Sequence, residues 1–309
     1  MRKTSVLTLL VFALFFVFAC LSCRRKTSKE KVSESRTSGK TTILVDETYA
    51  RILDDQIEVF KSDYPLATVN TVIGNENEIM PKFRQGEIKM LVLSRMLKPA
   101  EEYFYKQRKS RIYTDRFAID GLALINNKSD VDSTITVEEA YDIMRGTSKS
   151  GKKLVFDNAY SSTIRYFIDS AGIKELPKQG VYTLKTTNDV IKYVAENKGY
   201  IGIIGVNWLL KNVKEPSPFL SGIKTLAVRN LPNKKGGDAY YQPIQENLIN
   251  GKYPFLRNVY VINAEGTNGL GTGFATWLTS PRGQLIILKS GLGPHKLAER
   301  EFNLKTNKY

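Results

Sequence analysis

The sequence predicts an α/β protein whose sheets are mostly parallel and carry helices on both faces. Short runs of apolar and β-branched residues alternate along the chain with longer segments in which apolar residues recur every three or four positions. Glycines, prolines and hydroxyl-bearing residues separate these segments and supply start and stop signals for helices. With 309 residues, the chain is long enough for two lobes of about 150 residues each.

Most of the strand-like runs are short and lead directly into a helix-like segment. They are expected at 42–45, 67–73, 89–93, 116–125, 154–156, 200–206 and 259–262. The helix starts have local reasons. Pro99 stands at a first-turn position, Thr136 and Glu139 form a capping box, and Asn188 and Ser280 are N-cap candidates. Helix ends are expected at glycines, namely Gly86, Gly146, Gly199 and Gly291.

Residues 1–23 have the pattern of a lipoprotein signal peptide. Two basic residues precede a 14-residue apolar run at 6–19, which is short for a membrane-spanning helix and typical of a signal-peptide core. Ala19 followed by Cys20 is similar to a lipobox, so Cys20 is expected to carry the lipid, with Cys23 as the alternative. An ordinary signal peptide or a short membrane anchor is the competing interpretation.

Residues 24–40 are predicted to form a disordered, basic tether, because they are charged, rich in serine and threonine, and free of aromatic residues. Their basic side chains could also contact anionic lipid headgroups. The body that follows is expected to be soluble.

The chain is basic and poor in the side chains of common catalytic and metal sites. It has 46 Lys and Arg against 31 Asp and Glu, a formal charge of +15, which favours nucleic acid, anionic lipid or a small oxyanion as a partner. The only cysteines are Cys20 and Cys23, and the only histidine is His295, which we place in a surface loop. The body therefore offers no thiol nucleophile and no histidine for a zinc site or a Ser-His-Asp triad. Neither a metal nor a cofactor is expected.

Two patterns are set aside. The glycine-rich run 269–274 looks like a dinucleotide fingerprint but lacks glycine at the sixth position and has no βαβ unit before it. Tyrosine-rich stretches near Tyr103 and Tyr240 could stack on nucleic-acid bases, but packing within the protein is favoured. No nucleic-acid partner is expected.

Hydroxyl-bearing residues stand where three predicted strands give way to helices, at Thr48, Ser94 and the run 161–163. In parallel sheets ligands collect at the carboxyl ends of the strands, beside helix N-termini whose free N–H groups favour anions. Converging hydroxyls would add donors without adding charge. A single serine or threonine is usually only an N-cap. The triple run is the stronger signal, because one cap suffices.

The order of these motifs along the chain resembles that of the phosphate-binding proteins of ABC importers, the PstS-like type II periplasmic binding proteins. The resemblance covers about 42–292. It rests on Asp120-Gly-Leu-Ala-Leu-Ile-Asn126, Phe156-Asp-Asn-Ala-Tyr-Ser-Ser-Thr163, Gly199-Tyr-Ile-Gly-Ile-Ile-Gly-Val206, Gly251-Lys-Tyr-Pro-Phe-Leu-Arg257 and Thr279-Ser-Pro-Arg-Gly-Gln284. The lipobox and the Ser-Ser-Thr run look like the form found in Bacteroidetes-type bacteria.

The resemblance implies two α/β lobes with mostly parallel sheets, joined by a two-strand hinge, and a ligand between them. The crossing strands would lie near 117–125 and 257–262. The first lobe would combine 41–124 with 260–309, and the second lobe would be 125–259.

The resemblance also implies site residues. Thr48 matches the family's first hydroxyl turn, Gly74-Asn75 its second and Ser94-Arg95 its third. The ligand-binding candidates are Thr48, Asn75, Ser94, Arg95, Asp157, Ser161, Ser162 and Thr163.

One departure from the family pattern motivates a sharper hypothesis. The third turn usually reads Ser-Asp, and an arginine usually precedes the serine and threonine loop; here Arg95 and Asp157 occupy these positions, so the two charges are exchanged. We therefore expect Arg95 and Asp157 to meet at the cleft.

The resemblance implies capture of phosphate and delivery to an ABC-transporter permease, with no catalysis. The alternatives are another oxyanion such as sulfate or molybdate, a serine-based hydrolase, or a lipoprotein that senses or scaffolds. The protein is expected to be a monomer in the cell envelope, lipid-anchored on the periplasmic or extracytoplasmic side of a membrane.

Overall fold

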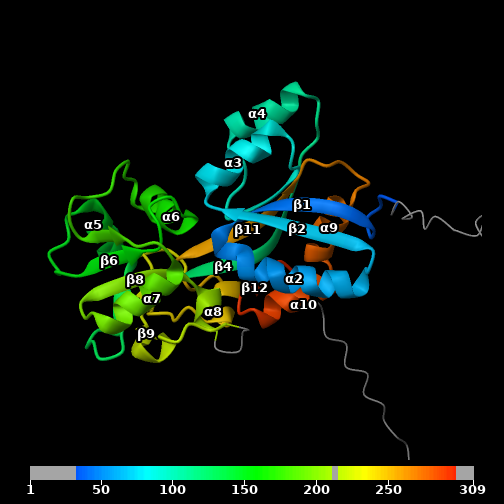
Figure 1. Ribbon diagram of the computed structural model, residues 1–309. Helices are drawn as coiled ribbons and strands as arrows, with labels where there is room; N and C mark the ends of the chain where they lie inside the picture. The colour runs from blue at the N-terminus through cyan, green and yellow to red at the C-terminus, as the bar shows by residue number, and fades with distance from the viewer. Residues whose placement is uncertain (1–32, 211–214, 297–309) are drawn as a thin grey trace, which may run out of the picture. The chain divides into compact units, whose positions relative to one another are not determined.

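Strands and helices alternate through the computed structural model, which describes residues 33–210 and 215–296 (Figure 1). The predicted signal peptide, with Cys20 and Cys23, and the tether up to residue 32 lie outside the described residues. The described residues from Glu34 onward form one compact unit. Two lobes are distinguished within it by the strands around which their helices pack.

The first lobe is built on three parallel strands. Strand β1 pairs with β2 on one side and β3 on the other. Helices cover both faces of this sheet (Figure 1). The elements of this lobe are β1 (Gly39–Asp46), η1 (Glu47–Tyr49), α2 (Ala50–Asp63), β2 (Ala67–Gly74), α3 (Glu76–Gln85), β3 (Met90–Leu93), α4 (Pro99–Gln107), α9 (Leu270–Thr279) and α10 (Pro281–Lys289).

The second lobe is built on β6, which pairs in parallel with β7 and β8. Its principal elements are α5 (Val137–Arg145), β6 (Lys153–Phe156), α6 (Ser162–Ala171), β7 (Val181–Thr183), α7 (Thr187–Glu196) and β8 (Tyr200–Gly205). Shorter elements complete the described chain: β5 (Thr134–Thr136), η2 (Val206–Leu209), η3 (Leu220–Gly222), β9 (Ile223–Thr225), β10 (Ala227–Arg229), α8 (Gln245–Ile249) and β12 (Gly293–Pro294).

Two antiparallel strands connect the lobes. Strand β4 (Tyr113–Asn127) is 15 residues long, and β11 (Leu256–Asn263) pairs with its first part and with β3. The second part of β4 pairs with β8. These strands include the segments predicted to cross between the lobes. Because β4 pairs with strands of both lobes, hydrogen bonding is continuous from one lobe to the other. The strand order is β2-β1-β3-β11-β4-β8-β6-β7, in one sheet rather than two separate ones.

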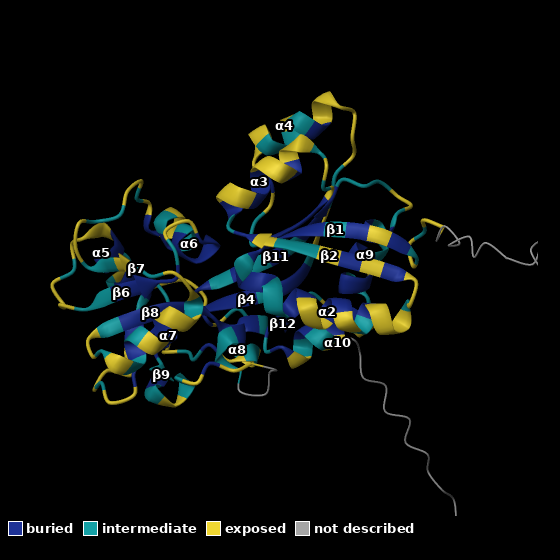
Figure 2. Ribbon diagram, viewed as in Figure 1, coloured by how far each residue is buried: buried dark blue, intermediate teal, exposed yellow. Residues whose placement is uncertain are grey.

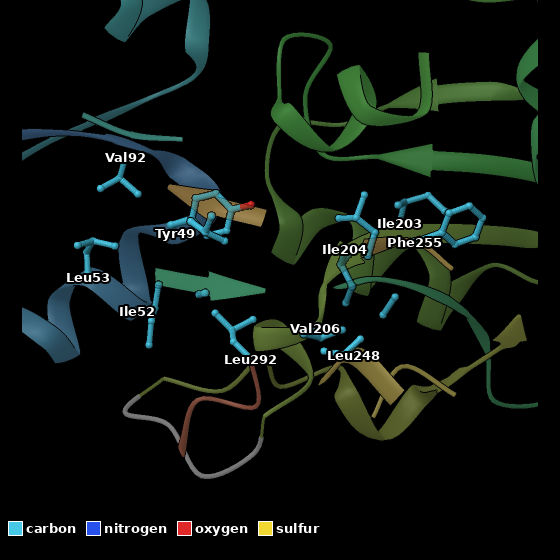
Figure 3. Close-up of a cluster of buried hydrophobic side chains, with 14 of the residues drawn as sticks. Tyr49, Ile52, Leu53, Val92, Ile203, Ile204, Val206, Leu248, Phe255 and Leu292 are labelled. Atoms are coloured by element: carbon cyan, nitrogen blue, oxygen red, sulfur yellow. The ribbon is translucent and has the colours of Figure 1, made fainter. Parts of the chain in front are cut away.

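Both lobes have a buried interior (Figure 2), and most of the residues that form it are apolar. The larger cluster runs from α2 across β4 and β11 into the second lobe, and Figure 3 shows part of it, with Tyr49 and Ile52 on one side and Ile203 and Phe255 on the other. A smaller cluster lies under α3 and α4. Burial on both faces explains why β3 and β8 are nearly continuous apolar runs.

Two expectations about helices need correction. Helix α7 is capped by Thr186 and not by Asn188, because Thr186, two residues earlier, forms a reciprocal capping box with Asp189. Helix α9 was not predicted, since its sequence contains Gly271 and Gly273. Gly273 is needed there: a β-carbon would collide with the backbone oxygen of Arg36.

Arg36 also shows that part of the predicted tether is ordered. The Arg36 side chain donates to the backbone oxygen of Thr267 at 2.7 and 3.0 Å, and β1 begins at Gly39. His295 also differs from a free surface residue. It is half-buried, and its Nδ1 accepts a hydrogen bond from Arg116 at 3.1 Å. Within 33–210 and 215–296, none of the helices is both long enough and apolar enough to cross a membrane.

Candidate functional site

The run 161–163 forms the start of α6, directly after β6 and its loop. Ser161 is the N-cap, and its Oγ accepts from the backbone N–H of Ile164 at 3.3 Å and donates to Asp157 Oδ1 at 2.5 Å. Ser161, Ser162 and Thr163 are all buried. One hydroxyl therefore caps the helix, and Ser162 and Thr163 remain beside the free N–H groups of its first turn.

Thr48 meets this helix start from the other lobe. The loop after β1 is shaped by Asp46, whose Oδ1 accepts the backbone N–H of Thr48 at 3.0 Å. The Thr48 hydroxyl then lies 3.3 Å from Ser162 Oγ, although the two residues are 114 positions apart. Two predicted candidates from opposite lobes are thus brought together.

A buried arginine that was not among the candidates completes this cluster. Arg257 on β11 donates through Nη1 to Ser162 Oγ at 3.0 Å and through Nη2 and Nε to Asp120 Oδ2 at 2.6 and 3.2 Å. Tyr49 also donates to this Asp120 oxygen, at 3.3 Å. An arginine inside a buried strand, in a motif quoted for the resemblance, was the signal that could have indicated Arg257. We call Thr48, Ser162, Arg257 and Asp120 the cleft cluster.

Electrostatics keep Arg257 charged. Burial opposes its charge, but interactions with Tyr49, Asp120 and Asp46 outweigh burial and raise the pKa of Arg257 above its usual range. Its charge has a counter-ion in Asp120, so the pair satisfies the requirement for a buried ion.

Further carboxylates surround the cleft cluster. Asp46, Asp120 and Asp157 are 0%, 0% and 5% exposed, and Asp46 Oδ2 and Asp120 Oδ1 have no hydrogen-bond partner among the described residues. Burial raises the pKa of Asp157, although hydrogen bonds from Ser161 and Asn158 act in the opposite direction. Such oxygens can accept hydrogen bonds, so a ligand that carries its own O–H groups suits this environment. Asn207, also missed from sequence, lies nearby and donates to the Thr48 carbonyl at 3.4 Å.

The expected pair of Arg95 and Asp157 does not form. Arg95 instead donates to Glu76 Oε2 at 2.7 Å and to both oxygens of Glu101 at 2.8 and 3.0 Å. Both glutamates lie in first turns of helices near the Arg95 loop, so they are closer counter-ions than Asp157 across the cleft. The hypothesis of charges exchanged across the cleft is therefore wrong in this structure.

The other two candidates, Asn75 and Ser94, also have hydrogen-bond partners. Asn75 caps α3: its Oδ1 accepts from the Glu78 N–H at 3.3 Å, and Glu78 accepts from the Asn75 N–H at 3.2 Å. Ser94 Oγ accepts from Arg165 Nη2 of the second lobe at 3.0 Å. Arg165 and Glu76 also pair, at 2.9 Å.

A groove of about 390 Å³ lies beside these charges, between α3 and α6. Its lining includes Glu76, Arg95, Ser161 and Arg165, so both lobes contribute. Within the described residues, no group of three histidine, cysteine or acidic side chains could hold a metal ion.

Known proteins similar to this chain agree with the resemblance predicted from the motifs. The chain is 24% identical over 294 residues to the phosphate-binding protein PstS of Pseudomonas aeruginosa, which covers 86% of this chain and 87% of the relative. A Clostridium perfringens structure, assigned as a phosphate ABC transporter substrate-binding protein and containing phosphate, matches with a TM-score of 0.68 and 18% identity over 84% of this chain and 100% of that one. An ABC-type phosphate transport receptor from Vibrio cholerae matches with a TM-score of 0.63 and 18% identity over 83% and 100%.

These structural matches confirm the predicted two-lobed α/β fold of periplasmic binding proteins. The family model described as the PBP superfamily domain matches residues 31–282, which include both connecting strands and, except for most of α10 and for β12, the described elements of both lobes. The chain belongs to the PBP superfamily.

Proposed function

We propose that this protein captures inorganic phosphate between its lobes and delivers it to the permease of an ABC importer. The observation that carries the proposal is the cleft cluster. Its Ser162, at the start of α6, lies within hydrogen-bond distance both of Thr48 from the first lobe and of the buried Arg257. Hydroxyls, a helix N-terminus and a guanidinium are the donors that an oxyanion requires. The similarity to PstS proteins supports phosphate as that oxyanion.

The buried carboxylates favour phosphate over sulfate or molybdate. Phosphate near neutral pH carries at least one proton and can donate to a carboxylate oxygen, such as Asp46 Oδ2 or Asp120 Oδ1. Fully ionised sulfate has no proton to donate and would be repelled by the same oxygens. A site built around a required hydrogen bond rejects the ligand that lacks it, because a buried polar group would be left unpaired.

The serine-based hydrolase is the weaker candidate. Asp157 does accept from Ser161 Oγ, as a base would, but the same oxygen accepts the backbone N–H of Ile164 and so caps α6. An oxygen held in this way by the first turn of a helix is not oriented to attack a substrate. We therefore assign Ser161 a structural role and propose binding without turnover.

Lipid anchoring at Cys20, an extracytoplasmic location and a monomeric state belong to the same proposal. They rest on the signal-peptide pattern and on the family, and the cysteines lie outside the described residues. A short anchor and a monomer suit a carrier that meets a membrane-embedded permease.

Titration calorimetry with phosphate, sulfate, molybdate and glycerol phosphate tests the function. Phosphate should bind with one site per chain, the other anions should bind at least about tenfold more weakly, and no phosphate should be released from the ester. Equal affinity for sulfate, or steady release of phosphate from the ester, would contradict the proposal. Asp63→Ala, which removes an exposed ion-pair partner of Arg282 away from the cleft cluster, is a control that should bind like the wild type.

A further inference from the structure

Arg165 joins the two lobes outside the cleft cluster. It lies in the first turns of α6, and its guanidinium reaches Glu76 at the start of α3 and Ser94 after β3. Nε lies 3.1 Å and Nη2 2.9 Å from Glu76 Oε1, and Nη2 lies 3.0 Å from Ser94 Oγ. These contacts span 89 and 71 positions of sequence and connect opposite lobes.

Glu76 is shared between arginines of the two lobes. Its Oε1 accepts from Arg165, and its Oε2 accepts from Arg95 at 2.7 Å. Arg95 is fixed in turn by both oxygens of Glu101. The Glu76 side chain is only 9% exposed, so it depends on both guanidiniums for compensation of its charge. The first-lobe side of this network is therefore anchored, and Arg165 is its connection to α6.

Ser94, the residue that Arg165 contacts in the first lobe, lies close enough to Tyr49 to influence the pKa of that hydroxyl. Tyr49 donates to Asp120 Oδ2 at 3.3 Å, and the same Asp120 oxygen binds Arg257. Arg165 therefore holds a loop that borders the buried pair of the cleft cluster.

We propose that Arg165 is the positioning residue that closes the phosphate site, because its contacts with Glu76 and Ser94 hold the lobes together and set the rate at which phosphate leaves. This inference rests on the proposed function. Arg165 lines the groove between α3 and α6 with a side chain that is 26% exposed, so it can part from Glu76 without unfolding either lobe. Opening then requires Arg165 and Glu76, a partly buried charge pair, to separate. Loss of such a pair changes mainly the rate of dissociation, here the rate at which phosphate leaves.

The matched comparison uses the two acidic partners of Arg165. Glu76 lies across the cleft, whereas Asp169 pairs with Arg165 within α6, at 3.3 Å and with a 67% exposed side chain. Glu76→Gln weakens the contact between the lobes. Asp169→Asn removes only the contact within the helix.

The experiment measures release of radiolabelled phosphate after dilution into excess unlabelled phosphate, by rapid filtration. Arg165→Gln and Glu76→Gln should each release phosphate about tenfold faster or more, with association rates changed much less, and Asp169→Asn should behave as the wild type. The double variant should release no faster than the faster single variant, because both changes break one contact. Arg165→Lys, which keeps the charge but not the two-nitrogen contact, should fall between Arg165→Gln and the wild type.

The outcomes separate the two proposals. If the wild type binds phosphate and Arg165→Gln and Glu76→Gln release it at the wild-type rate, the closing role is wrong and the proposed function stands. If the wild type does not bind phosphate, the proposed function fails, and the closing role fails with it. The closing role would also be wrong if only Arg165→Gln released phosphate faster, with wild-type release in Arg165→Lys and Glu76→Gln, and if circular dichroism showed that Arg165→Gln had lost folded structure.

Discussion

Arg257 and Asp120 form a buried ion pair in which two guanidinium nitrogens share one carboxylate oxygen. Nη2 and Nε lie 2.6 and 3.2 Å from Asp120 Oδ2, and both side chains are 1% exposed. The third nitrogen lies 3.0 Å from Ser162 Oγ, while Asp120 Oδ1 has no partner among the described residues. The pair thus holds one N–H at the start of α6 and leaves one carboxylate oxygen available.

Breaking this pair should be costly for folding. Asp120→Ala should lower the free energy of unfolding by about 3–5 kcal/mol, because Arg257 would remain buried without its counter-ion. Urea unfolding of the ligand-free protein measures the effect. Asp63→Ala, which removes the exposed partner of Arg282, should cost about 1 kcal/mol or less. Similar costs for the two variants would show that burial of the Arg257 pair does not matter.

Ser162 should matter for binding more than for stability. Ser162→Ala removes the hydroxyl that contacts both Thr48 and Arg257, so phosphate affinity should fall by about tenfold or more. Calorimetry measures the change. Thr136→Ala is the control: it removes the N-cap of α5, should cost about 1 kcal/mol of stability, and should leave affinity unchanged. Wild-type affinity in Ser162→Ala would remove Ser162 from the ligand site.

Arg95 and Asp157 should not act as a unit. The exchanged variant Arg95→Asp/Asp157→Arg should not recover phosphate affinity relative to its two single variants, because Arg95 is held by Glu76 and Glu101 rather than by Asp157. A double-mutant cycle on the calorimetric binding free energies checks this. Recovery in the exchanged variant would restore the hypothesis of a pair across the cleft.

Asp157 should make the stability of the ligand-free protein depend on pH. Burial raises the pKa of Asp157 above 3.8, so the folded state holds this proton more tightly than the unfolded state. The resulting stabilisation is complete below pH 3.8 and is lost as the pH rises through the raised pKa. Asp157→Asn should therefore gain stability relative to the wild type as the pH is raised from about 4 to 7. Urea unfolding across this range tests the sign, and a constant difference would contradict it.

Lipidation should depend on Cys20. Labelling of expressing cells with a fatty-acid analogue should be lost in Cys20→Ala and kept in Cys23→Ala, because Ala19-Cys20 is similar to a lipobox. Loss of label only in Cys23→Ala, or equal labelling of both variants, would contradict the assignment.

The sequence by itself determined the α/β class and most elements, and it indicated candidates for the site. The strand-like runs 116–125 and 259–262 fell inside β4 and β11, and Thr136, Pro99 and Ser280 started helices as expected. These features depend on residues close in sequence, through periodicity and caps. Hydroxyls at helix starts also carry a local signal, so Thr48 and Ser162 could be named as candidates before the contact between them was known.

Only the tertiary structure decided how the charges pair. Nothing near Arg257 in sequence indicates that Asp120, 137 positions away, is its counter-ion. Arg95 and Asp157 were matched by analogy of position, but Glu76 and Glu101 lie closer to Arg95 once α3 and α4 are packed on the first sheet. Helix α9 was missed because its glycines oppose a helix locally, while the close approach of Arg36 requires one of them. Ion pairs and backbone contacts depend on distances in space, and these are set by how the two lobes meet at β4 and β11.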